Sequence, residues 1–193
     1  MRENTYSELE RIIERVRGGF LRGYSSDDFR VVREKCKELS SIPESERNEL
    51  AECVVNEIVE TTLAVRGGSR AARHLLLGAG RLLQTSEEKA RLYLYVARSY
   101  LQEDRPKKAH PWYQRAYSLF PHVVTAQHLV SSHSHLGNLE HALIVANQAA
   151  RVFPDSEALL FERAQIYMTL GGAQAAYTDL KNVLSLETFF TKL

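Results

Sequence analysis

Apolar residues recur at three- and four-residue spacing through most of the chain, and nearly all prolines and glycines lie between such segments. This period puts apolar side chains on one face of a helix, so the pattern predicts an all-α protein with almost no strand. Four amino-terminal helices are expected, bounded by glycine pairs, prolines and polar capping residues. Their extents are about Tyr6 to Arg17, Ser26-Asp27-Asp28 to Pro43, Pro43 to Gly67-Gly68, and about Arg70 to Leu83.

After Thr85-Ser86 the same residue types recur at a longer interval. Three series of small or turn-forming residues keep intervals of 33 and 34 residues, and a Phe-Pro pair recurs once after 33. The series are Ala109, Ala142 and Ala176; Ala116, Ala149 and Val183; and Asp104, Gly137 and Gly171, and the pairs are Phe120-Pro121 and Phe153-Pro154. Each unit is therefore predicted to be a helix, a tight turn and a second helix.

The repeated part of the chain resembles the tetratricopeptide repeat (TPR) family, whose 34-residue motif has aromatic, small and proline positions at set intervals. The first unit matches at every signature interval, the second keeps the alanines and the proline, and the third lacks the closing proline. The matching residues are Tyr93, Val96, Ala97, Tyr100, Ala109, Tyr113, Ala116 and Pro121; Ala126, Leu129, Val130, His133, Ala142, Ala146, Ala149 and Pro154; and Leu160, Ala164, Tyr167, Ala176, Leu180 and Val183, with Arg163 where leucine is usual. The resemblance implies a right-handed helical-repeat solenoid of antiparallel helix pairs, about three repeats in residues 90–187.

This assignment gives an expected domain organisation. Residues 1–88 are expected to form amino-terminal helices, and residues 89–193 three TPR-like repeats, continuous as a single structural domain. The segment from Asn56 to Leu83 is a candidate for a degenerate earlier repeat. Pro111 lies inside an expected helix of the best-matching repeat, where it should remove a hydrogen bond and kink that helix.

Composition and charge narrow the classes of function. The 193 residues are 44% hydrophobic and 25% charged with a formal net charge of +1, which excludes global disorder and gives no long-range field for steering toward nucleic acid. We interpret Cys36 and Cys53 as reduced core thiols. No apolar run is long enough to span a bilayer and the first residues do not resemble a signal peptide, so we expect a cytoplasmic protein.

No pattern of catalytic or cofactor-binding residues emerges. Five of the seven histidines fall between His122 and His141, but none are paired at helical metal-site spacing, so we expect no metal site. His133 stands at a usual tyrosine position and is predicted to be a packed, hydrogen-bonded core residue, while His128 and His135 are candidates to face a groove. The glycine pairs lack a phosphate-loop lysine, and no Gly-x-Ser-x-Gly is present. We therefore expect no catalytic residue and no cofactor.

The family resemblance implies a concave groove lined by the first helix of each repeat, in which TPR proteins bind peptides or helices. Carried over by register, its lining residues are Arg91, Leu94, Arg98, Leu101, Gln127, Ser131, Ser134, Phe161, Gln165 and Met168. The lysine and asparagine clamp of chaperone-binding TPR proteins is missing. The mixed surface favours a peptide or amphipathic helix with apolar anchors and an acidic flank. The expected function is a non-catalytic adaptor, scaffold, or assembly or secretion chaperone.

Two further surfaces leave alternatives open. The segment Arg66–Arg81 holds four arginines and no acid, and Arg70, Arg73 and His74 share one helical face. This face is either solvated or a docking surface for an acidic peptide or for nucleic acid. Binding of nucleic acid there would make the protein a nucleic-acid-binding regulator. The apolar carboxyl-terminal residues, including Phe189, Phe190 and Leu193, could pack back, form a homodimer or join a larger complex. An enzyme with an unrecognised site is a third possibility.

Overall fold

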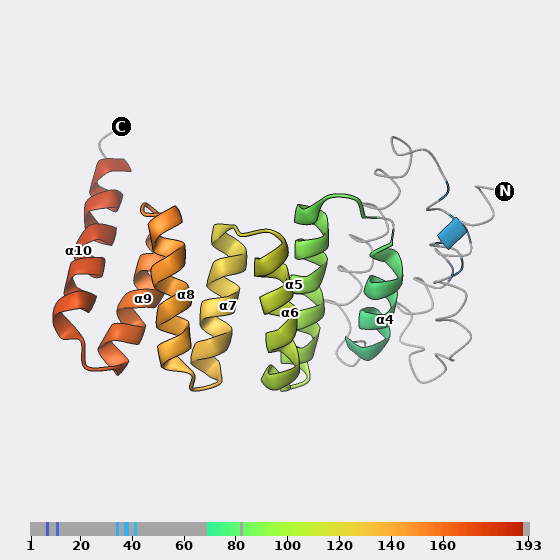
Figure 1. Ribbon diagram of the computed structural model, residues 1–193, viewed down its shortest axis with the longest axis horizontal. Coiled ribbons are helices and arrows are strands. Elements are labelled where there is room, and N and C mark those ends of the chain that lie inside the picture. The colour runs from blue at the N-terminus through green and yellow to red at the C-terminus, as the bar shows by residue number, and fades with distance from the viewer. Residues whose placement is uncertain are drawn as a thin grey trace. The chain divides into compact units, whose positions relative to one another are not determined.

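The computed structural model describes residues 7, 11, 34, 37, 38, 41, 69–81 and 83–190, of which 69, 71, 72, 75 and 186–190 are described by backbone only. Within these residues the structure consists of helices and turns, which confirms the all-α prediction (Figure 1). The helices of residues 69–190 are α4 (Ser69–Ala79), α5 (Ser86–Gln102), α6 (Pro106–Leu119), α7 (Val123–His135), α8 (Leu139–Val152), α9 (Glu157–Thr169) and α10 (Ala173–Phe190).

The chain divides into two compact units, Met1–Arg105 and Pro106–Leu193. The boundary falls between the two helices of the first predicted repeat, whereas the sequence suggested a boundary at residues 88 and 89. The helices predicted before residue 69, both cysteines, Leu193 and the side chains of Phe189 and Phe190 lie outside the described residues.

In the first unit, α4 packs against α5. A capping box explains why α5 begins at Ser86: the Thr85 hydroxyl accepts a hydrogen bond from Glu88 N at 3.1 Å, and Glu88 Oε2 accepts one from Thr85 N at 2.9 Å. The predicted end of α4 at Leu83 is wrong, because the helix ends at Ala79. Gly80 follows that residue, and glycine is a poor helix former, so the chain turns there.

In the second unit, α6 to α10 follow one another as antiparallel neighbours (Figure 1). Helix α7 packs against α6 and α8, and also against α9, the first helix of the next repeat. Small residues allow this close approach, since Ala142 and Ala146 are fully buried beside Val130 and Ile166. A second cluster joins Ala126, Ala149 and Leu159. The alanines that defined the repeat are therefore the contact points between helices.

Three left-handed turns confirm the repeat register. Asp104, Gly137 and Gly171 have φ values of 55°, 75° and 79°. After each, the next residue donates a backbone hydrogen bond to the carbonyl of Tyr100, His133 or Tyr167, at 3.0, 2.9 and 2.7 Å respectively. This is the Schellman arrangement that ends a helix, and it recurs at equivalent positions of all three TPR-like repeats.

Pro111, which was expected to disturb its helix, does not end that helix. Helix α6 runs from Pro106 to Leu119 with Pro111 inside it. Pro106 stands in the first turn, where a missing N–H is harmless, and Pro111 is on the exposed side. None of the described helices is both long enough and apolar enough to cross a lipid bilayer.

Candidate partner-binding groove

In the first unit, the predicted groove residues occupy one face of α5. Arg91 and Arg98 are exposed, Leu94 is half-buried and Leu101 is exposed. Their spacing of three and four residues brings them onto one side of the helix. This face offers two guanidinium groups beside apolar side chains.

In the second unit, the predicted residues lie on α7 and α9, which contact each other. Gln127, Ser131 and Ser134 of α7 are half-buried. Phe161 and Met168 of α9 are 48% and 64% exposed, with the exposed Gln165 between them. Large apolar side chains that stay this accessible are candidates for contacts with another molecule.

An open pocket of about 410 Å³ brings three of these residues together. Ser131 and Ser134 of α7 line it, and so does Gln165 of α9. Two polar residues that the groove prediction omitted also line it, Glu162 and Thr169, and so does His135, a candidate to face a groove. Apolar contacts come from Val130, Leu139 and Ile166. The lining residues of α9 are spaced three and four apart, so the helix presents them along one stripe.

Glu162 is the unusual group in this pocket. Its Oε2 atom is sealed from solvent and has no hydrogen-bond partner. Burial raises the pKa of Glu162 to about 7, against a smaller opposing effect of His135. A single sequence gave no sign of this, because Glu162 stands beside a groove position and its burial depends on α7.

His135 is the other titratable residue that lines the pocket. Its Nδ1 lies 2.7 Å from the Ser131 carbonyl oxygen. A carbonyl only accepts, so Nδ1 carries the proton and donates. In the neutral ring Nε2 is then an acceptor. The expectation for His135 as a groove residue matches its place in the pocket.

Three other histidines, His110, His133 and His141, form a packed cluster of α6, α7 and α8. His133 is buried, and its ring centroid lies 4.4 Å from that of His110 and 5.7 Å from that of His141. It is packed as predicted, but its Nδ1 lacks a hydrogen-bond partner, so the predicted bond is absent at that atom. His128 is exposed and stacks on Tyr113. In the described part of the chain, no three His, Cys, Asp or Glu residues are arranged to hold a metal ion.

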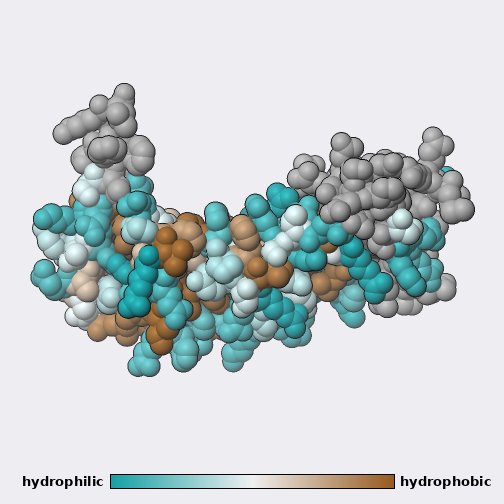
Figure 2. All heavy atoms as spheres, turned by 45° about the horizontal axis from the view of Figure 1, so that its top comes forward, coloured by the Kyte–Doolittle hydropathy of each residue, from teal (hydrophilic) through white to brown (hydrophobic). Residues whose placement is uncertain are grey.

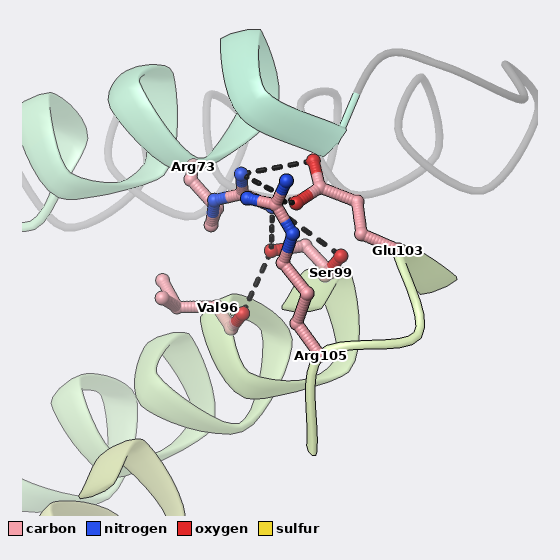
Figure 3. Close-up of polar contacts among 5 residues, drawn as sticks. All are labelled: Arg73, Val96, Ser99, Glu103 and Arg105. Atoms are coloured by element: carbon pink, nitrogen blue, oxygen red, sulfur yellow. Dashed lines mark hydrogen bonds and ion pairs between the residues drawn. The ribbon is translucent and has the colours of Figure 1, made fainter. Parts of the chain in front are cut away.

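The basic face predicted on α4 needs a correction. Arg70 and His74 are exposed, but Arg73 is only 6% exposed. Its guanidinium contacts both Glu103 carboxylate oxygens at 2.9 and 3.1 Å and donates to the Ser99 carbonyl at 3.3 Å (Figure 3). It also lies 4.0 Å from the centroid of the Tyr100 ring. Arg73 therefore joins α4 to α5, and its charge is compensated inside the protein.

Arg163, which departs from the repeat pattern, has a similar structural role. It donates to Asp179 of α10 from Nε at 2.8 Å and from Nη2 at 2.6 Å. Its Nη1 donates to Asn147 Oδ1 of α8 at 3.2 Å. One arginine thus ties three consecutive helices together where leucine would supply only apolar contact.

The outer surface of the described helices carries both polar and apolar side chains. Figure 2 shows apolar residues interleaved with polar ones over the visible face of the described helices. On α10, Tyr177 and Leu184 are strongly exposed. They precede Phe189 and Phe190, the residues predicted as a second interface, whose side chains are not described.

Comparison with solved structures agrees with this geometry. No protein-family model and no curated protein matches the sequence. A crystal structure of MamA matches with a TM-score of 0.61 and 17% identity over 100% of this chain and 96% of that one. A kinesin light chain-like protein of Podosopora anserina with nearly identical TPR-like repeats matches with a TM-score of 0.59 and 15% identity over 97% of this chain and 96% of that one.

The chain has a TPR-like repeat fold. The register of alanines, the three left-handed turns and the contact between α7 and α9 support this independently of the comparisons. At these identities the likeness establishes the fold alone.

Proposed function

We propose that this protein is a non-catalytic interaction module that binds a segment of a partner protein on the exposed faces of α7 and α9, with the exposed face of α5 in the first unit as a separate contact surface. Helical repeats of this kind present extended surfaces for such segments. The observation that carries the proposal is the pocket between α7 and α9, whose lining includes Ser131, Ser134 and Gln165, three residues that the repeat register had assigned to a groove. An adaptor, a scaffold, or an assembly or secretion chaperone acting in the cytoplasm would use such a surface.

The partner segment is a peptide or an amphipathic helix. Phe161 and Met168 are accessible apolar contacts for its anchors. On α5, the exposed Arg91 and Arg98 favour an acidic partner sequence. A homodimer or a larger complex through the carboxyl-terminal apolar residues remains a separate proposal.

The nucleic-acid alternative is weaker than the sequence suggested. It required Arg73 on an exposed basic face, but this residue is buried and paired with Glu103. Arg70 and Arg81 remain exposed. A nuclease arm in the binding experiment is sufficient to test it.

An affinity pull-down from native cell extract tests the function. The double variant Arg98→Ala, Phe161→Ala should lose a protein that the intact chain recovers, while helicity stays unchanged. Ile144→Ala, Arg151→Ala is the matched control, because both residues are exposed on α8. Equal recovery by both double variants would contradict a groove site, and nuclease-sensitive recovery would favour nucleic acid.

A further inference from the structure

The pocket between α7 and α9 contains an unsatisfied anionic group. Among the described residues, the buried Oε2 atom of Glu162 has no hydrogen-bond partner. A buried carboxylate without a partner costs free energy, and a cation with hydrogen-bond donors relieves that cost. The raised pKa of Glu162, about 7, has the same physical cause.

The rest of the lining is also suited to a cation. Ser131, Ser134 and Thr169 supply hydroxyl oxygens, and because Nδ1 of His135 donates to the Ser131 carbonyl, Nε2 is the ring atom left to accept in the neutral form. Among the described residues that line this pocket there is no Lys or Arg, and His135 is the one group that can become cationic.

The carboxyl ends of two helices add further negative electrostatic potential at the pocket. Ser134 and His135 belong to the last turn of α7, which ends at His135, and Ile166 and Thr169 belong to the last turn of α9, which ends at Thr169. Two helix carboxyl ends therefore border one pocket, and each carries partial negative charge that favours a nearby cation.

We propose that this pocket receives the side chain of an arginine or lysine from the partner segment, with Glu162 as its counter-ion. The inference rests on the proposed function and deepens it. Phe161 and Met168 lie along α9 beside the lining stripe, so an apolar residue next to the basic one completes the motif.

Synthetic probe peptides test this charge preference directly. The arginine peptide Ac-Leu-Ala-Arg-Ala-Leu-NH2 is compared with the same peptide carrying citrulline, a neutral analogue of similar shape, or glutamate in place of arginine. Titration is followed by amide chemical shifts of Ser134, Gln165 and Thr169. We expect the arginine peptide to bind about tenfold more tightly than the citrulline peptide, because only the former pairs with the carboxylate.

Glu162→Gln is the decisive variant, since it keeps the size of the side chain and removes the charge. It should abolish the preference for arginine over citrulline. Glu157→Gln is the matched control, because Glu157 is on the same helix outside the pocket lining, and it should keep the preference. In the intact protein, the arginine peptide should also lower the pKa of Glu162, measured by its carboxyl carbon shift.

The outcomes separate this inference from the proposed function. Equal binding of arginine and citrulline peptides, a preference for glutamate, or no shift at the three pocket amides would overturn the basic-residue inference. If the pull-down still depended on Phe161, the interaction function would stand. If neither the pull-down nor the peptides showed groove-dependent binding, both would fall.

Discussion

Buried histidines link the stability of the repeats to pH. Burial lowers the pKa of His133 below its ordinary value, and the charges of His110 and His141 add to the effect. Burial likewise lowers the pKa of His110. An unfolded chain then takes up protons more readily than the folded one, so the stability that these neutral rings contribute is present above about pH 6.5 and is lost as the pH falls.

We predict that His133→Tyr makes the repeats less sensitive to acid. Tyrosine occupies the equivalent positions 100 and 167, and it does not titrate in this range. Urea midpoints at pH 7.5 and pH 5.5 should differ less in the variant than in the intact protein. Glu162 is present in both proteins, so its own titration cancels in the comparison. If the urea midpoint of the variant fell as much as that of the intact protein, or more, between pH 7.5 and pH 5.5, the role of His133 would be contradicted.

Glu162 has the opposite pH dependence. Its pKa in the folded protein, about 7, is above the ordinary value of 4.5, so its contribution to stability is full at low pH and is lost as the pH rises through 7. Glu162→Gln should raise the free energy of unfolding at pH 8 by roughly 1 kcal/mol, after allowance for solvent screening, and change it little at pH 4.5. A variant less stable than the parent at pH 8 would show that the carboxylate has a stabilising partner. A stability cost at one residue is typical of sites kept for binding.

At the scale of the element, the three left-handed turns hold the helix pairs in register. Gly137 has φ of 75°, and a Cβ placed there would meet nothing within 4 Å. The cost of Gly137→Ala is therefore backbone strain alone, and we predict a loss of about 1–2 kcal/mol in unfolding free energy by urea denaturation. Gly80→Ala is the control, because its Cβ contacts are ordinary at 3.5 Å and its φ is not positive, so stability should not fall. Equal losses in both variants would contradict this account of the turn.

The α4–α5 contact provides a second test at this scale. Arg73→Ala should destabilise the first unit by about 2 kcal/mol, because it removes the charged hydrogen bonds to the part-buried Glu103, which keeps only the more exposed Arg105 at 3.6 Å. Arg70→Ala, an exposed change on the same helix, should stay within about 0.5 kcal/mol. Circular dichroism in urea measures both. If both variants lost the same small amount of unfolding free energy, Arg73 would be an ordinary surface cation.

These residues also show which parts of the structure the sequence could predict. Helix positions, the close-packed alanines and the three turns follow from local spacing and from one repeated interval. Periodicity put Arg73 on a face with Arg70, but its burial depends on Glu103, thirty residues later, which no local pattern reveals. Glu162 was missed for the same reason. Its unusual environment arises only where α7 and α9 pack together.

For the whole molecule, the central claim is that the helix faces bordering the α7–α9 pocket bind a partner protein. Site-specific photo-crosslinking tests it most directly, with p-benzoylphenylalanine replacing Phe161 in one protein and Ile144 in another. The two positions are similarly exposed, at 48% and 52%, but Ile144 lies on α8 and does not line the pocket. In living cells we predict a discrete light-dependent adduct from position 161 and none from position 144. No adduct at position 161, or the same adducts from both positions, would contradict the claim.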